Sequence, residues 1–166
     1  MYTASLSELK KELKMLPADE LLAVCFRLAR YKKENKELLH YLLLESDNES
    51  FYIEQVKEDI VEAFSTVNTS SMYLAKKTIR KALRLAAKQI RYSGNKQTEL
   101  EILMFFCKSL LELDLPLGHS KVMINLLKNQ LKKIEKALQS MHEDLQYDYR
   151  IELDELIEKV RRLSPF

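Results

Sequence analysis

The sequence predicts an all-α protein, and three observations support this fold class. The chain has only two Gly and three Pro in 166 residues, so it lacks the residues on which the turns between β-strands depend. Strong helix formers such as Leu, Lys, Glu and Ala are abundant instead. Apolar side chains recur at spacings of three and four, as on the buried face of a helix. We therefore expect seven or eight antiparallel helices, arranged as helical hairpins within a single domain over residues 1–166.

The first third of the chain predicts three helices. The first begins after an N-cap at Ser5 or Ser7 and ends at Pro17, which suits the first turn of the second helix. The second helix runs to about Lys32, and Asn35 is expected to cap the third. The run YLLLE at residues 41–45 is apolar on nearly all sides, which predicts its burial. The other side chains expected to be buried are Leu6, Leu9, Leu13, Leu16, Leu21, Val24, Cys25, Leu28, Ala29, Leu38 and Leu39.

The middle of the chain predicts three more helices. Ser46 and Glu49 have the spacing of a capping box before the fourth helix, which carries Ile53, Val56, Ile60, Phe64 and Val67 on its apolar face. NTSS ends this helix and caps the fifth, which runs from Met72 to about Tyr92. Ser93-Gly94-Asn95 then gives a stop and a new N-cap. The sixth helix carries Leu100, Leu103, Met104, Phe106, Cys107, Leu110 and Leu111, and PLGHS at 116–120 closes it.

The last third predicts a long helix followed by a final one. From Ser120 to Tyr147 the helix spans about 42 Å at 1.5 Å per residue. It carries a heptad seam of Ile124, Leu127, Leu131, Ile134, Leu138, Met141 and Leu145. The final helix carries Leu153, Leu156, Val160 and Leu163. The two are joined by a tight turn near Asp148, or they form one continuous helix. The predicted domain thus consists of helical hairpins over 1–118 and this long helical segment over 119–166.

The succession of hairpins resembles HEAT-like α-solenoids at the level of the fold. The second and third helices form one expected hairpin, and the fifth and sixth form another. The repeat signatures of tetratricopeptide and ankyrin proteins are absent. The alternative is an irregular bundle that ends in a long helix or helical hairpin.

The fifth helix carries the clearest candidate functional surface. Residues 76–91, KKTIRKALRLAAKQIR, contain seven cations and no acid, although the net charge of the whole chain is only +2. At 100° per residue the seven cations fall within an arc of about 140°. Tyr73 lies within this arc near its start. We call the seven cations the basic stripe; they are Lys76, Lys77, Arg80, Lys81, Arg84, Lys88 and Arg91.

The basic stripe has two interpretations. In the first, together with Tyr73, it binds a polyanion, either a nucleic acid or an acidic protein surface, because phosphates along a nucleic-acid backbone neutralise such a row of cations. In the second, it is a solvated face neutralised by acids of the neighbouring helices. The acids expected to do so are Glu54, Glu58, Asp59, Glu62, Glu99 and Glu101.

A different hypothesis gives the protein no nucleic-acid role. The heptad helix over 120–147 then serves as a protein–protein interaction or homodimerisation scaffold, with Met123, Leu126 and Met141 as exposed anchors. The same seam has a second explanation, which is pairing with the final helix inside the monomer.

The sequence predicts no catalytic residue, metal site or cofactor. His40, His119 and His142 lack the HExxH spacing of a metal site, and the two glycines lie too far apart for a phosphate-binding loop. Cys25 and Cys107 lie in apolar runs without CxxC spacing, which predicts free thiols in a reducing compartment. No segment has the pattern of a signal peptide or of a membrane span. We therefore expect a cytoplasmic, non-enzymatic protein without membrane contact or small-molecule substrate.

Overall fold

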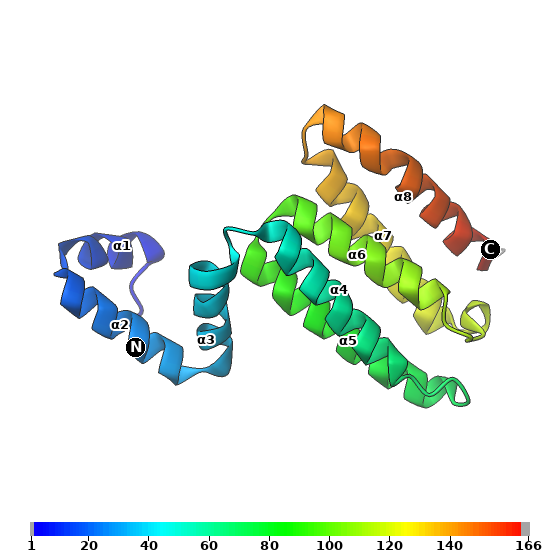
Figure 1. Ribbon diagram of the computed structural model, residues 1–166, viewed down its shortest axis with the longest axis horizontal. Coiled ribbons are helices and arrows are strands. Elements are labelled where there is room, and N and C mark those ends of the chain that lie inside the picture. Colours follow the sequence, from blue (N-terminus) through cyan, green and yellow to red (C-terminus); the bar gives the residue numbers. More distant parts are fainter. Residues whose placement is uncertain (1, 164–166) are drawn as a thin grey trace. The chain divides into compact units, whose positions relative to one another are not determined.

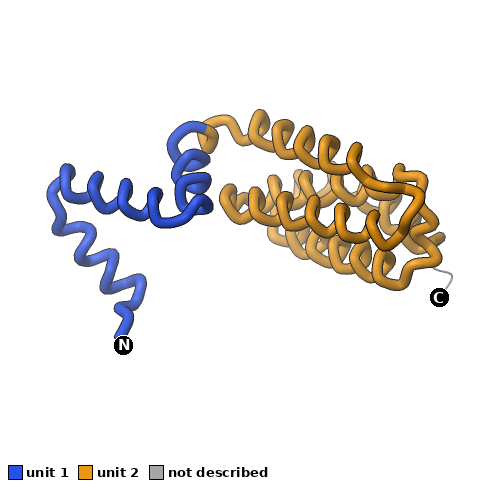
Figure 2. Tube along the Cα trace, turned by 90° about the horizontal axis from the view of Figure 1, so that it is seen from below, with its two compact units in different colours: residues 1–44 blue, residues 45–166 orange. Residues whose placement is uncertain are grey.

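A computed structural model of the chain describes residues 2–163 and shows an all-helical fold (Figure 1). Within these residues there are eight α-helices and no strand. None of the helices in this range combines the length and the apolar character that crossing a bilayer requires. The chain divides into two compact units, residues 1–44 and 45–166 (Figure 2). Compact units can belong to one folding domain, so the expected single domain stays a prediction.

The first unit contains three short helices, α1 (Leu6–Met15), α2 (Ala18–Tyr31) and α3 (Lys33–His40). A single π-helical turn, Tyr41–Glu45, follows α3. The predicted cap at Ser5 is confirmed as a full capping box: the Glu8 N–H donates to Ser5 Oγ at 3.3 Å, and the Ser5 N–H donates to Glu8 Oε2 at 2.7 Å. Pro17 stands immediately before α2, at its N-cap position.

The prediction that Asn35 caps α3 is wrong. The helix begins at Lys33, with Lys32 at the N-cap position, three residues before the predicted cap. The Asn35 side chain instead donates from Nδ2 to the carbonyl oxygen of Leu28 at 2.8 Å. Carbonyl groups in the last turn of a helix lack intrahelical partners. Asn35 therefore satisfies one of these groups in α2 and holds α2 against α3.

The prediction of a buried face in the first unit is also wrong. None of α1, α2 and α3 contains a buried residue. In the run 41–45 only Tyr41 is buried, while Leu42, Leu43 and Leu44 are exposed. Periodicity shows which side of a helix is apolar, but a second layer of structure must cover that side before it becomes a core.

The second unit is a helical bundle with a conventional core. It contains α4 (Glu49–Ser65), α5 (Met72–Ser93), α6 (Lys96–Leu111), a 3₁₀ turn (Leu117–His119), α7 (Lys121–Gln139) and α8 (Glu143–Leu163). Helix α6 packs against α4, α5, α7 and α8 and is therefore the central helix. Its Phe106 is fully buried and lies against Phe64 of α4, with 5.2 Å between the ring centroids. Most side chains predicted to be buried in α4 and α6 are buried; Val67 and Leu111 are only partly so.

Local capping signals in this unit are correct with one exception. Ser71 caps α5, Gly94 takes the left-handed conformation with φ 65°, and Asn95 caps α6. At α4, however, Asn48 accepts from the Phe51 N–H at 3.2 Å, so the predicted capping box of Ser46 and Glu49 is wrong.

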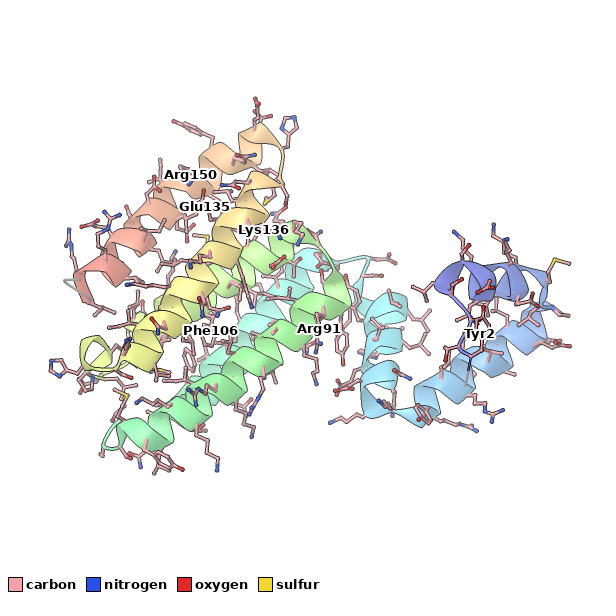
Figure 3. All side chains as sticks on the ribbon, turned by 180° about the vertical axis from the view of Figure 1, so that it is seen from behind. Tyr2, Arg91, Phe106, Glu135, Lys136 and Arg150 are labelled. Atoms are coloured by element: carbon pink, nitrogen blue, oxygen red, sulfur yellow. The ribbon has the colours of Figure 1, made fainter. Side chains whose placement is uncertain are left out.

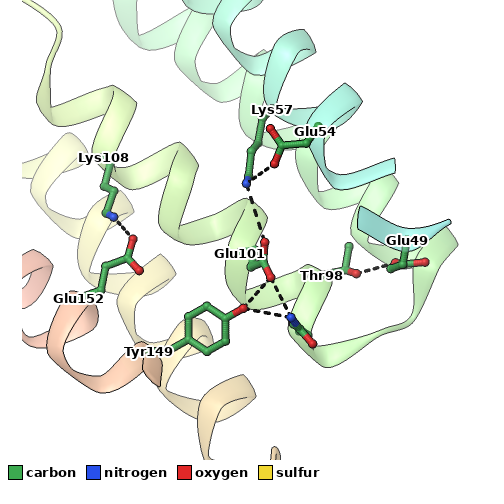
Figure 4. A network of polar contacts seen from close by, with 9 residues as sticks. Glu49, Glu54, Lys57, Thr98, Glu101, Lys108, Tyr149 and Glu152 are labelled. Carbon is green, nitrogen blue, oxygen red and sulfur yellow. Dashed lines mark hydrogen bonds and ion pairs between the residues drawn. The ribbon is translucent and has the colours of Figure 1, made fainter. Parts of the chain in front are cut away.

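Glu49 has a tertiary role in place of that capping box. Its carboxylate accepts a hydrogen bond from Ser93 Oγ. It also accepts one from Thr98 Oγ1 at 2.5 Å (Figure 4). Ser93 ends α5 and Thr98 begins the core face of α6. The start of α4 is therefore fastened to the turn between the next two helices.

Both predicted connections near residue 148 are wrong, because the long helix ends at Gln139 and α8 begins at Glu143. In the break, Ser140 Oγ donates to the Ala137 carbonyl at 2.7 Å, and Gln146 Nε2 donates to the Met141 carbonyl at 2.8 Å. No Gly or Pro marks the position. The break lets α8 fold back along α7 and bury an apolar face made of Leu153, Leu156 and Val160.

The heptad seam of α7 packs against other helices of the same chain, α6 and α8. Ile124, Leu127, Ile134 and Leu138 are buried. Met123 is also fully buried, so it is not an exposed anchor, and Leu126 and Met141 are partly buried. The α7–α8 hairpin is closed on its polar side by Arg150, whose Nη1 lies 3.0 Å from Glu135 Oε2 (Figure 3).

Gln130 is a buried polar side chain within this apolar setting. Its Nε2 donates to the Leu126 carbonyl at 3.3 Å, but its Oε1 has no hydrogen-bond partner among the residues that the structure describes.

Replacing Gln130 with Leu removes a buried acceptor that costs about 1–3 kcal/mol when unpaired. We expect Gln130→Leu to raise the free energy of unfolding by about 1 kcal/mol in urea titrations, since part of this gain is offset by the lost donor bond. Gln139→Leu, at an exposed position of the same helix, should change it by less than about 0.5 kcal/mol. A destabilised Gln130→Leu protein would contradict the expectation.

Candidate nucleic-acid interface

Helix α5 positions the basic stripe by burying its opposite side. Ala75, Ile79, Ala82 and Ala86 are buried and recur at helical spacing. Three of the four are alanines, and their small side chains allow α5 to approach α4 and α6 closely. The helix is well defined at both ends, because Ser71 Oγ accepts from the Leu74 N–H at 3.4 Å and the Gly94 N–H donates to the Ile90 carbonyl at 2.9 Å. The cationic side therefore points away from the core.

The structure brings all the predicted site residues together on this outer side of one helix. Five cations of the basic stripe are exposed, and Lys76 and Lys88 are partly buried; the exposed five are Lys77, Arg80, Lys81, Arg84 and Arg91. Arg91 is labelled on α5 in Figure 3. Tyr73, at the start of the helix, is 79% exposed. From Lys76 to Arg91 the stripe extends about 22 Å at 1.5 Å per residue.

Six cations of the stripe form no ion pair with any residue in the described range 2–163. Lys88 differs, because its Nζ lies 6.0 Å from the centre of the Tyr92 ring, within reach of a cation–π interaction. Cations four residues apart on one helix repel each other by a few tenths of a kcal/mol per pair. These six cations of the stripe therefore remain an uncompensated positive surface, stabilised by the burial of the other side of α5.

Among residues 2–163, the acids expected to neutralise the stripe form ion pairs with other residues or form none. Glu54 lies 2.7 Å from Lys57 of the same helix, and Lys57 also lies 3.8 Å from Glu101 (Figure 4). Glu99 lies 2.7 Å from Lys96. Each of these distances joins carboxylate oxygen to Lys Nζ. The ion pairs of these acids are thus made with lysines outside the stripe.

The pKa of Asp59 gives independent evidence that the remaining acids of α4 do not pair with the stripe. Its pKa is raised, first by partial burial and then by the negative charges of Glu62 and Glu58. A neighbouring cation would lower this pKa instead. Asp59, Glu62 and Glu58 therefore form an acidic group whose members repel one another, and no stripe residue pairs with them in the described part of the chain.

Glu101 is held in a polar cluster that joins α6 to α8. The Tyr149 hydroxyl donates to Glu101 Oε1 at 2.6 Å, and Gln97 Nε2 lies 3.0 Å from both Glu101 Oε1 and Tyr149 Oη. Burial, followed by the hydrogen bond to Glu101, raises the pKa of Tyr149 to about 12. A neutral phenol that donates to a carboxylate is a structural contact, and the partners of Glu101 within residues 2–163 thus lie on α4, α6 and α8.

A second basic surface, which the sequence analysis missed, lies between α7 and α8. It is an open groove of about 490 Å³, lined mostly by polar side chains of α7 and by Ile157 of α8. Lys128, Lys132 and Lys136 recur every fourth residue on one side of α7, and no residue in the range 2–163 forms an ion pair with them. The remaining lining residues are Asn125, Asn129, Leu131, Glu135 and Gln139. The four-residue spacing of these lysines places them on one side of α7, opposite the apolar seam, and is visible in the sequence.

The described residues show no arrangement that supports metal binding. No group of three or more His, Cys, Asp or Glu side chains is placed to hold an ion within 2–163. His142 Nδ1 lies 3.4 Å from Asp144 Oδ2, but both side chains are well exposed. Burial raises the pKa of the Cys107 thiol to about 12, which removes the thiolate that metal binding or nucleophilic attack requires.

Comparison with protein-family models, with curated proteins and with solved structures gives no match to this chain. The geometry of α5 is therefore the basis for assigning a function.

Proposed function

We propose that the protein is a non-enzymatic helical module that binds nucleic acid through the basic stripe of α5. One observation carries the proposal: six cations share one helix face and have no carboxylate partner within residues 2–163. A nucleic-acid strand offers phosphates at regular intervals, so it neutralises a linear row of cations along its whole length. The contact is then mainly with the backbone and carries little base specificity.

The composition of the stripe favours phosphate as its ligand. Three of its members are arginines, and the planar guanidinium group donates two parallel hydrogen bonds to phosphate oxygens. Duplex DNA carries one negative charge per about 1.7 Å of axis, so about a dozen charges face or flank a stripe of about 22 Å. Tyr73 supplies an exposed ring at one end of the stripe, on which an unpaired base can stack. A helix with lysines alone, without arginines or an exposed aromatic ring, would fit an acidic protein surface as well as it fits phosphates.

The proposal predicts a steep dependence of binding on salt. Each phosphate neutralised contributes about −0.9 to the slope of log K against log [salt] for duplex DNA, and about −0.7 for single strands. We expect a slope of about −4 to −6 for the wild-type chain, measured by fluorescence anisotropy with labelled single-stranded RNA and duplex DNA of equal length. Heparin serves as a polyanion without bases. A slope shallower than about −1, or no binding at low salt, would overturn the proposed function.

The finer structural and cellular predictions belong with this proposal. We propose that α2–α3 and α5–α6 each have the form of a HEAT-like helical hairpin, a fold element that often carries a binding face. Two free cysteines are consistent with a reducing compartment, and we place the protein in the cytoplasm on this basis.

A further inference from the structure

The groove between α7 and α8 carries a row of cations separate from the basic stripe. Lys128, Lys132 and Lys136 line this groove, and all three side chains are exposed. Residues four apart on a helix are neighbours on one face, so the three ammonium groups follow a line of about 12 Å. We call these three residues the α7 lysine row. Helix α7 as a whole carries five lysines and only one acid.

The acids close to the α7 lysine row pair with arginines within residues 2–163. Glu135, the acid of α7, accepts from Arg150, with 3.0 Å between Oε2 and Nη1. Asp154 of α8 lies 4.0 Å from the same Nη1, and Glu158 lies 3.3 Å from Arg161 Nη1. The α7 lysine row forms no ion pair in this range. It is therefore an uncompensated positive surface, like the stripe of α5.

The other lining residues of the groove favour phosphate over an acidic protein. Lysines alone suit carboxylates and phosphates equally, so the neighbouring side chains decide between them. Asn125 and Asn129 are exposed and add neutral donors beside the lysines, and amides and lysines are both common phosphate contacts. A protein helix docks through several apolar or aromatic anchors. The lining offers two aliphatic side chains, Leu131 and Ile157, and no aromatic ring.

Helices α5 and α7 lie on the same side of the second unit. Both pack against α6, and both run in the direction opposite to it (Figure 1). Seen from behind, α5 and α7 are nearer to the viewer than α4 and α6 (Figure 3). The buried side of α5 packs on α4 and α6, and that of α7 packs on α6 and α8. The basic stripe and the α7 lysine row therefore run in the same direction on one side of the unit.

The separation of the two cationic rows suits a nucleic acid with two backbones. Helices in direct contact lie about 8–10 Å apart, so the axes of α5 and α7, which share α6 as a neighbour, lie within about 20 Å. The backbones of a DNA duplex are separated by grooves about 6 and about 12 Å wide. A single strand has one backbone, which the stripe of about 22 Å on α5 can follow by itself. When one strand of a duplex lies on α5, the other is within reach of α7.

We infer that the α7 lysine row binds the second strand of a nucleic-acid duplex whose first strand lies on the basic stripe of α5. This inference rests on the proposed function, because it requires that α5 binds a phosphate backbone. It adds the class of nucleic acid, since the two rows together select duplexes over single strands. Removal of the α5 cations weakens binding of both forms, whereas removal of the α7 lysine row weakens binding of the duplex alone.

The variant Lys128→Gln/Lys132→Gln/Lys136→Gln of the full-length chain tests the inference, because glutamine removes each charge without adding an acid. Its affinity is measured by fluorescence anisotropy for a labelled DNA duplex of about 12 base pairs, about 40 Å long, and for one strand of that duplex alone. We expect a loss of about 100-fold for the duplex and of less than about 10-fold for the single strand. The salt slope for the duplex should become shallower by about one for each lysine removed.

Two further variants control for charge and for folding. Lys10→Gln/Lys11→Gln/Lys14→Gln removes the same charge from exposed positions of the first unit and should cost less than about 10-fold with either probe. Lys128→Arg/Lys132→Arg/Lys136→Arg keeps the charges of the row and should retain the preference for the duplex. Far-UV circular dichroism checks the helicity of all three variants.

The inference and the proposed function fail in different ways. A wild-type chain that binds neither probe overturns both. A wild-type chain that binds both probes, with a glutamine variant whose loss for the duplex is less than about 10 times its loss for the single strand, overturns the inference alone. Poly-L-glutamate carries carboxylates and no phosphate. A glutamine variant that loses affinity for this polymer but keeps the duplex assigns the groove to an acidic protein and also overturns the inference.

Discussion

Replacing Lys77, Arg80, Lys81 and Arg84 with Glu is expected to lower the affinity for nucleic acid by about 1,000-fold or more. Each removed side chain donates a charge-assisted hydrogen bond to phosphate, and a loss of about 1 kcal/mol at each of four positions multiplies to that factor. The introduced carboxylates also repel the backbone. The salt slope should become shallower by about one for each cation removed. Fluorescence anisotropy at several salt concentrations measures both quantities.

The four positions suit this test because replacing their side chains does not disturb the core. All four side chains are exposed and unpaired within residues 2–163, while the buried side of α5 is formed by Ala75, Ile79, Ala82 and Ala86. Lys88 is left unchanged because it lies over Tyr92. We expect the far-UV circular dichroism and the urea midpoint to stay close to those of the wild type.

A second quadruple variant controls for total charge. Lys10, Lys11, Lys14 and Lys36 are also exposed helical cations, but they lie in the first unit. Replacing these four with Glu changes the net charge by the same amount. If binding depends on α5, this variant should lose less than about 10-fold in affinity, through long-range electrostatics alone. Equal losses in the two variants would show that the stripe is not the contact surface.

Phe106→Ala is expected to destabilise the second unit by about 3–5 kcal/mol, since truncation of a fully buried aromatic side chain leaves a cavity. Phe106 lies on the central helix α6 and packs against Phe64 of α4 at 5.2 Å between ring centroids. This loss is a large fraction of the stability of a typical domain, about 5–15 kcal/mol. Hydrogen exchange of the α6 amides measures it separately from any opening of the first unit.

The adjacent residue gives a matched control for this prediction. Phe105 is only partly buried, and Lys57 Nζ lies 5.9 Å from its ring centre. Phe105→Ala should therefore cost about 1 kcal/mol, through lost contact area and a weakened cation–π interaction. Similar losses for the two variants would mean that α6 does not occupy the centre of the bundle.

The candidate site could be found from the sequence because it lies on a single helix. The positions of the basic stripe follow from the helical repeat once α5 is identified, and its caps at Ser71 and Gly94 are local signals. Whether the acids of α4 and α6 cover the stripe could not be predicted, because that depends on where these helices lie. The α7–α8 groove was missed for the same reason: only the return of α8 along α7 makes Lys128, Lys132 and Lys136 line a concave surface.

Single polar residues near helix ends were the least predictable features. Asn35 and Glu49 have the residue types and spacings of caps, but both are used in longer-range contacts, with the Leu28 carbonyl and with Ser93 and Thr98. A side chain that can cap its own helix can also bond to a neighbouring one, and the local spacing of residues does not distinguish the two.

The sequence by itself determined that the chain is helical, where most of its helices begin, and which side of each helix is apolar or basic. These properties depend on interactions between residues a few positions apart. Only the tertiary structure decided that the chain turns back at Ser140 rather than near Asp148, that the seam of α7 is closed by α8, and that the apolar sides of α1–α3 remain exposed. The physical reason is that burial depends on which surfaces meet in space, and helical periodicity contains no information about the partner.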